Sequence, residues 1–169
     1  MRTYRFRRRR GGGRSRKRRH VALVNAPATE TRTTSATTLK RRIVECFFEI
    51  LLMVKLYHWN TYSYSTHKAT DELYSKLGDN IDRFMEVFLG KTAAAGMDPM
   101  GGRIKGLNSI KMINIDDKKE MAIKIGELLT FLDKLGGELS LFSEKGDLLT
   151  IRDEIIADLN QFLYLLTLH

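Results

Sequence analysis

The sequence is short of the residues that cross-link or interrupt a chain. Its 169 residues include one cysteine, Cys46, so no internal disulfide can form and an oxidising compartment is not required. The two prolines, Pro27 and Pro99, lie outside the segments with helical periodicity, which favours a helical protein. The length suits one domain that is large enough to bury a hydrophobic core.

Long hydrophobic runs are also missing. The most apolar stretch, residues 43–54, contains Glu45 and Glu49 and spans about 12 residues, whereas a membrane-spanning helix needs roughly 20. No apolar segment typical of a secretory signal lies near the start of the sequence. We therefore expect neither a membrane span nor a secretory signal.

What is present is positive charge, and it is concentrated at one end. The net charge is +9, yet residues 21–169 contain 18 basic and 20 acidic residues, a balance of −2. Residues 1–20 contain no acidic residue and too little apolar surface to fold alone, so we interpret them as a polycationic N-terminal arm. Its basic residues are Arg2, Arg5, Arg7, Arg8, Arg9, Arg10, Arg14, Arg16, Lys17, Arg18 and Arg19.

Such an arm needs a partner that is rich in negative charge. Nucleic acid, bound by release of counterions, is the commonest partner of a run like this, and double-stranded DNA is the form we expect. An acidic groove in an assembled protein shell, a patch of anionic lipid, or recognition as a nuclear localisation signal would fit the same composition. Composition does not separate these alternatives.

The rest of the chain divides into two parts. Residues 21–36 are rich in threonine and alanine, and we expect them to form an extended linker. Residues 37–169 show apolar residues at helical spacing in four stretches, which predicts four helices. The helices are expected at about residues 37–59, 65–89, 118–135 and 147–168.

The connections between these helices indicate the topology. Residues 90–115 have no helical periodicity, and a connection of about 25 residues is far longer than two antiparallel neighbours need. It suits parallel second and third helices, so we predict an all-α, ferritin-like four-helix bundle with a long crossover. Asp116 and Asp117 suit the start of the third helix. The Leu-Gly-Gly at 135–137 could break or kink that helix, and Thr150 with Asp153 could form a capping box in the fourth.

One segment resembles a known family. His-Trp-Asn at 58–60, followed by a histidine, an aspartate four residues later and then Asp-x-x-x-Glu, is similar to the Dps family, the ferritin-like DNA-protecting proteins of starved bacteria. The resemblance implies a shell of subunits, with iron bound between two of them and DNA held by a basic tail. The two histidines are closer in this sequence than is usual in the family. The implied iron ligands are His58, His67, Asp71, Asp82 and Glu86.

The whole chain, including the segments IRDEI and QFLYLLTL near its end, is also similar to an uncharacterised ferritin-like family of large DNA viruses and phages. That resemblance carries no known activity. It implies a viral origin, with the virion as the final location and the host cytoplasm or nucleus as the place of assembly.

The residues themselves limit where a metal could bind. His67, Asp71, Asp82 and Glu86 are separated by four, eleven and four residues, so they share one stripe of the second helix. This stripe lies about 110° from the apolar line of that helix and faces outward, so a metal site there would need a neighbouring subunit. The simpler alternative is a solvated polar face.

Other candidates are weaker. His58 lies on the apolar face of the first helix, where a core residue with a hydrogen-bonded ring is the first interpretation and a metal ligand the second. The Glu-x-x-His motif of a di-iron centre inside a bundle is missing, and Cys46 has apolar neighbours that argue against a nucleophile. Four aromatic residues suit either a docking surface or packing at a helix end: Tyr57, Trp59, Tyr62 and Tyr64.

Two functions of different classes therefore remain. The first is a non-enzymatic virion component, in which the helical bundle makes oligomer or shell contacts and the arm engages the genome or acidic capsid proteins. The second is a Dps-like ferroxidase and DNA-protecting protein with iron at a subunit interface. We prefer the first, because the arm and the viral resemblance require no metal site.

Overall fold

The computed structural model describes residues 28–97, 103–104, 106–107 and 109–168. The regular secondary structure in these ranges consists of helices alone. The polycationic arm and residues 21–27 of the expected linker lie outside them. The elements are α1 (Ala28–Asn60), α2 (Tyr64–Ala94), α3 (Lys118–Glu138), a short 3-10 turn η1 (Leu139–Leu141) and α4 (Gly146–Thr167).

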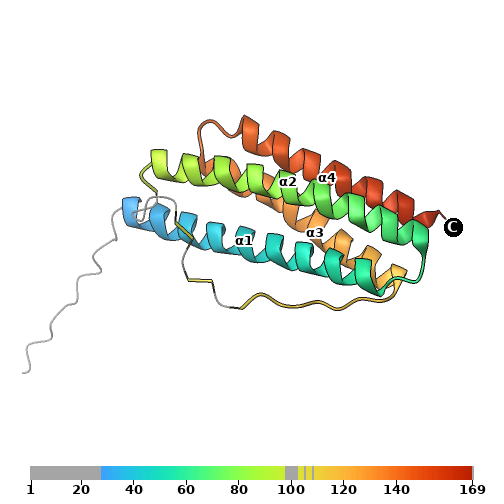
Figure 1. Cartoon of the computed structure of the whole chain (residues 1–169). Coiled ribbons are helices and arrows are strands. Elements are labelled where there is room, and N and C mark those ends of the chain that lie inside the picture. Colours follow the sequence, from blue (N-terminus) through green and yellow to red (C-terminus); the bar gives the residue numbers. More distant parts are fainter. Residues whose placement is uncertain (1–27, 98–102, 105, 108, 169) are drawn as a thin grey trace, which may run out of the picture.

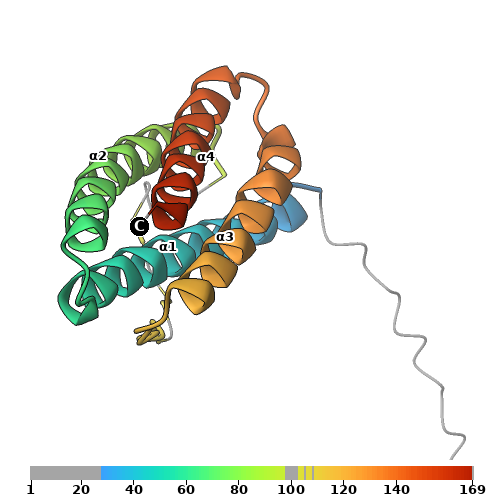
Figure 2. The ribbon, with the colours of Figure 1, turned by 90° about the vertical axis from the view of Figure 1, so that its right-hand side faces the viewer.

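The four helices form a bundle in which α2 and α3 run in the same direction (Figure 1). The described part of the connection between them, within residues 103–117, runs back along α1. Lys40 of α1 donates to the carbonyl oxygen of Arg103 in this connection (2.8 Å), and Asn60, at the other end of α1, bonds to Asn114 (2.7 Å). The α1 helix packs on α2 and α3, and α4 also packs on α2 and α3 (Figure 2). Because α1 and α4 run opposite to α2 and α3, neighbouring helices are antiparallel. The predicted all-α bundle of four helices is confirmed.

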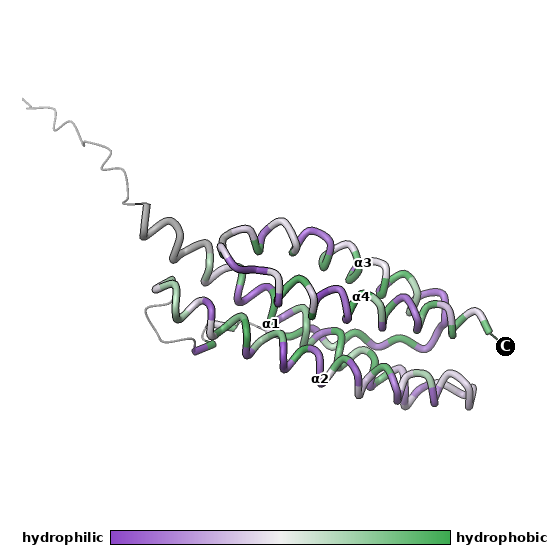
Figure 3. The backbone as a smooth tube through the Cα atoms, turned by 90° about the horizontal axis from the view of Figure 1, so that it is seen from above, coloured by the Kyte–Doolittle hydropathy of each residue, from purple (hydrophilic) through white to green (hydrophobic). Residues whose placement is uncertain are grey.

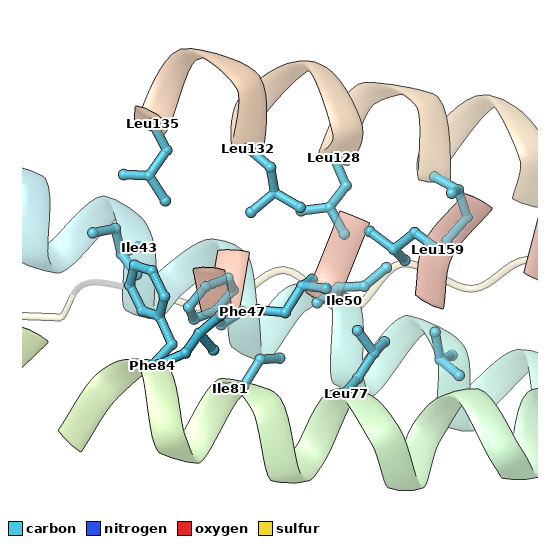
Figure 4. Packing of buried hydrophobic residues seen from close by; sticks show 14 of the residues in the cluster. Ile43, Phe47, Ile50, Leu77, Ile81, Phe84, Leu128, Leu132, Leu135 and Leu159 are labelled. Carbon is cyan, nitrogen blue, oxygen red and sulfur yellow. The ribbon is translucent and has the colours of Figure 1, made fainter. Parts of the chain in front are cut away.

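Each helix buries one apolar face. Hydrophobic and hydrophilic residues therefore alternate from turn to turn along each helix (Figure 3). The labelled side chains of α1, α2, α3 and α4 in Figure 4 point toward one another. Aromatic rings continue along the core: Phe84 meets Phe47 edge-on (centroids 5.4 Å apart) and lies 6.1 Å from Phe88, which meets Phe142 at 5.6 Å. Both α2 phenylalanines are fully buried. No described helix has the length and hydropathy of a membrane span.

The start of α1 differs from the expectation. The helix begins at Ala28, so residues 28–36 are helical and not part of an extended linker. Ala36 and Leu39 are buried and extend the apolar stripe of α1 toward the N-terminus. Alanine favours a helix, and packing of this stripe outweighs the weak helix propensity of the threonines around it.

The third and fourth helices confirm one local prediction and correct two. Asp117 caps α3, because its side chain accepts from the backbone N–H groups of Lys119 and Glu120. The expected break at 135–137 does not occur, since α3 continues to Glu138. The guanidinium of Arg152 in α4 lies where a side chain at Gly136 would begin, so a larger residue there would have to displace this flexible group.

The capping box is also absent. The helix α4 begins four residues before Thr150, and the Thr150 hydroxyl donates to the carbonyl oxygen of Gly146 within the first turn. Asp153 accepts from Arg152 instead (2.5 and 3.0 Å). The turn before Gly146 therefore starts the helix without a side-chain cap.

Candidate metal site at the corner between α1 and α2

The corner between α1 and α2 is tight. The α1 helix ends at Asn60 and α2 begins at Tyr64, with Ser63 as its N-cap; the Ser63 hydroxyl accepts from the backbone N–H of Thr66 (3.3 Å). The backbone N–H of Thr61 still bonds to the carbonyl oxygen of Tyr57 (3.0 Å), which extends the turn of α1 into the loop. This short connection brings the last turn of α1 against the first turns of α2.

Two predicted ligands meet at this corner. The rings of His58 and His67 stack with their centroids 3.9 Å apart and their planes 24° apart. Nδ1 of His58 lies 3.1 Å from the carbonyl oxygen of His67, and Nδ1 of His67 lies 3.1 Å from the carbonyl oxygen of His58. A carbonyl oxygen only accepts, so both rings carry their proton on Nδ1. In the neutral rings Nε2 is then a lone-pair donor, which is the arrangement that metal-binding histidines use.

His58 is also a core residue. It is 7% exposed, and its Nδ1 lies 3.1 Å from the hydroxyl oxygen of Thr70, which is fully buried. The Thr70 hydroxyl has one proton, which it donates to the α2 backbone at Thr66 or His67 (2.9 Å to each carbonyl oxygen). The expectation of a buried histidine with a hydrogen-bonded ring is confirmed, and the tautomer leaves ligation through Nε2 chemically open.

The predicted carboxylates lie elsewhere on α2. Asp71, Asp82 and Glu86 are exposed, as the outward stripe requires, whereas His67 is half-buried against α1. Asp82 is 15 residues from His67, about 22 Å along a helix. Among the described residues of one chain, no group of three or more histidine, cysteine, aspartate or glutamate side chains is positioned to hold a metal ion. The histidine pair and the Asp82–Glu86 pair could share an ion only if two chains contributed.

Exposed aromatic side chains surround the corner. Trp59 is 67% exposed, and Tyr62 and Tyr64 are more exposed still, whereas Tyr57 is buried. The ammonium of Lys55 lies 5.8 Å from the ring centre of Trp59 and 4.7 Å from that of Tyr74, so it bridges α1 and α2 by cation–π contacts. Of the four aromatic residues singled out in the sequence, one packs in the core and three face outward.

A second feature was not visible in the sequence. A pocket of about 160 Å³ lies between α1, α3 and the long connection, lined mainly by apolar side chains, with Cys46 and Glu49 on its α1 side. Burial, with Glu49 adding to it, raises the pKa of Cys46 to about 12. The thiol therefore stays protonated at neutral pH, in line with the expectation that it is no nucleophile. Residues of α1 and α3 form most of its lining, and Ile113 of the connection adds to it, so the pocket depends on tertiary packing.

Comparison with known proteins places the chain in a family. Residues 58–166 match the sequence model of a family of unknown function, DUF5856. The chain belongs to this family. The matched segment begins at His58 and contains the histidine corner, α2, α3 and nearly all of α4, whereas most of α1 lies before it. No curated protein and no solved structure matches the chain.

Proposed function

We propose that this member of DUF5856 is a structural component of a large DNA virus particle, a minor capsid or genome-associated protein. In this proposal the bundle makes assembly contacts, and the N-terminal arm binds double-stranded DNA or acidic surfaces of other virion proteins. The protein works as an oligomer or within a larger assembly. It resides in the virion after assembly in the host cytoplasm or nucleus. The viral origin rests on the sequence resemblance, and the mode of action rests on the surface of the bundle.

The observation that carries the proposal is the apolar outer side of α1 and its corner. Phe48 and Leu52 are 45% and 38% exposed, and Trp59 follows seven residues after Leu52 on the same side of the helix. Tyr62 and Tyr64 are also exposed, in the corner that follows α1. Aromatic residues gathered on one surface are typical of protein interfaces, because they bury large areas at low cost in side-chain entropy. An assembly contact uses such a surface and requires no catalytic group.

Two measurements test this function. Quantitative mass spectrometry of purified particles should find the protein at a fixed number of copies per particle, and its absence from clean particles would overturn the proposal. The second replaces all arm arginines with lysine, which keeps the charge but removes the planar, bidentate guanidinium. We expect incorporation into particles to fall sharply while DNA affinity weakens only modestly. Normal incorporation, combined with DNA binding that falls steeply with salt, would identify DNA as the arm's partner.

The histidine corner supports a second candidate, a Dps-like ferroxidase that also protects DNA. Both histidines hold their proton on Nδ1 against a backbone carbonyl, which directs Nε2 toward ligation. The parallel course of α2 and α3 supports this candidate, because the second and third helices of a ferritin-like bundle also run in parallel. Imidazole and carboxylate ligands suit iron, which would here be the substrate. His58, His67 and Asp71 would bind it on one subunit, with Asp82 and Glu86 of another.

Iron binding distinguishes the two candidates. The ferroxidase predicts stoichiometric ferrous ion binding by the full-length protein and its loss in the double variant Asp82→Ala, Glu86→Ala. A matched control, Glu120→Ala with Asp133→Ala, removes the same charge from exposed positions on α3. Equal binding and oxidation by the wild type and both variants would eliminate the ferroxidase. Loss in the first variant alone would instead establish it.

A further inference from the structure

The outer face of α1 and α2 has two parallel ridges. The apolar ridge lies on α1 and consists of Phe48, Leu52 and Trp59, all exposed. The acidic ridge lies on α2 and consists of Asp71, Asp79, Asp82 and Glu86, all exposed and none in an ion pair within the described residues. Lys68 is the basic side chain on the same side of α2.

Lys55 shows that the two ridges flank one seam. Lys55 lies on the same side of α1 as Phe48, Leu52 and Trp59, because these positions are three or four residues apart. The ammonium of Lys55 lies over the ring of Tyr74 in α2. Tyr74 is in turn three residues after Asp71. The aromatic faces along this seam already hold a cation, so the surface combines apolar area, exposed ring faces and negative charge. A segment that complements it carries arginines.

We propose that residues 14–19 of the same chain dock along this seam between the apolar ridge and the acidic ridge. This inference rests on the proposed function only in taking the arm as the segment that meets partners. The segment contributes Arg14, Arg16, Lys17, Arg18 and Arg19, and no acidic residue. Arginine suits both ridges, because guanidinium groups pair with carboxylates and stack on aromatic rings.

The lengths of helix and arm agree with this docking. Phe47 meets Phe84, and Lys55 meets Tyr74, so the acidic ridge lies level with α1 residues near 47 to 55. At about 1.5 Å per residue, this stretch is roughly 29 to 40 Å from Ala28. An extended chain leading back from Ala28 at about 3.3 Å per residue places Arg19 at about 30 Å and Arg14 at about 46 Å. The distances from Ala28 to Arg14 and Arg19 along an extended arm therefore cover the distances from Ala28 to the acidic ridge.

Docking of this kind has a consequence for the arm's other partners. The acidic ridge and an external polyanion compete for the same arginines, and the ridge is present at the high effective concentration of a tethered site. Nucleic acid must displace the ridge before it binds the whole arm. The same acids serve as iron ligands in the ferroxidase candidate, so docking of the arm and that site exclude each other.

Cross-linking tests where the arm docks. Lys17 is the lysine of residues 1–20, and a carbodiimide joins its amine to a carboxylate only at contact distance. We expect the full-length protein, without nucleic acid or particles, to give Lys17 links to the acidic ridge that disappear in high salt. A mixture of light and heavy isotope-labelled protein should give links within one copy. Links spread evenly over all exposed carboxylates, or links between copies, would overturn the proposal.

Two full-length variants test the competition. The ridge variant neutralises the four acids of the acidic ridge, and the control variant neutralises four exposed acids elsewhere: Asp116→Asn, Glu120→Gln, Asp133→Asn and Glu144→Gln. Both lose the same charge. We expect the ridge variant to bind a DNA duplex of mixed sequence several-fold more tightly than the control variant. Equal affinities would overturn the competition. Because the cross-link map involves no DNA or virion protein, it fails separately from the proposed function.

Discussion

The two sides of α2 differ in whether their charged side chains form ion pairs within the chain. Toward α4, the polar side chains of α2 find partners within the chain. These pairs are Lys76 with Asp158 and Gln161, Asn80 with Asp158, Arg83 with Glu154, and Lys91 with Asp147. Toward α1, the polar contacts between described residues are the hydrogen bonds of His58 and His67 and the cation–π contact of Lys55. The acids beside them form no ion pair within the described structure.

This contrast shows which surface is complete in one chain. The seam between α2 and α4 pairs its charges within the chain. The seam between α1 and α2 keeps exposed aromatic rings and uncompensated carboxylates on its outer side. The proposed assembly contacts and the proposed docking of the arm both use this outer face. Substitutions on the two sides should therefore behave differently.

The largest effect is expected in the core beneath both seams. Phe84 is fully buried between Phe47 and Phe88, so Phe84→Ala should lower the free energy of unfolding by about 3–5 kcal/mol through the cavity it leaves. The matched substitution on the outer face, Phe48→Ala, should cost at most about 1 kcal/mol, because half of that ring is exposed already. Denaturant titration measures both. A comparable loss in the two variants would mean that α1 is rotated relative to this account.

The next effect concerns the histidine corner. His58→Ala leaves the buried Thr70 hydroxyl oxygen and the His67 carbonyl without their ring donor, which should cost about 1–3 kcal/mol of unfolding free energy. His67→Ala should cost less, because that ring is half-buried and bonds to a carbonyl at the end of α1. The reverse order in thermal or denaturant unfolding would refute the role of His58 as the buried member of the pair.

The seam between α2 and α4 should respond weakly to acid. The hydrogen bond from Lys91 holds the pKa of Asp147 below its ordinary value of 3.8. A lowered pKa adds stability above the ordinary value, and this contribution is lost as the pH falls through the lowered one. Wild type should therefore lose more stability on acidification than Asp147→Asn, by a small amount because the pair is exposed. An identical pH dependence in salt-free buffer would contradict the pairing.

The smallest effect is expected on the acidic ridge. Asp71→Asn, Asp82→Asn and Glu86→Gln should each leave the unfolding free energy of the full-length protein within about 0.5 kcal/mol of wild type, because none of them forms an ion pair in the described structure. A loss of several kcal/mol in any of them would show that its side chain faces the bundle. Thermal melts monitored by circular dichroism are sufficient for this comparison.

The sequence was enough to predict the four helices, because the apolar spacing of Leu73, Leu77 and Phe84 persists over many turns. The cap at Asp117 was predictable as well, because an aspartate before a helix accepts hydrogen bonds from its first backbone N–H groups. The start of α1 was not predictable, because burial of Ala36 and Leu39 extends the apolar stripe beyond the expected start. The continuation of α3 through Gly136 was not either, because glycine disfavours a helix interior. The candidate site divides in the same way. The outward stripe follows from periodicity, whereas the reciprocal hydrogen bonds of His58 and His67 depend on how tightly the corner closes.

The most direct test of a partner-binding outer face uses Trp59, the only tryptophan of the chain. Its indole is 67% exposed on the apolar ridge, so its fluorescence reports whether this face is covered. In the full-length protein we predict that acrylamide quenches Trp59 less than it does in the ridge variant, and that the control variant behaves like wild type. Added DNA duplex should raise quenching in the wild type by drawing the arm away. Equal quenching in all three proteins, with and without DNA, would contradict docking of the arm on the outer face of α1 and α2.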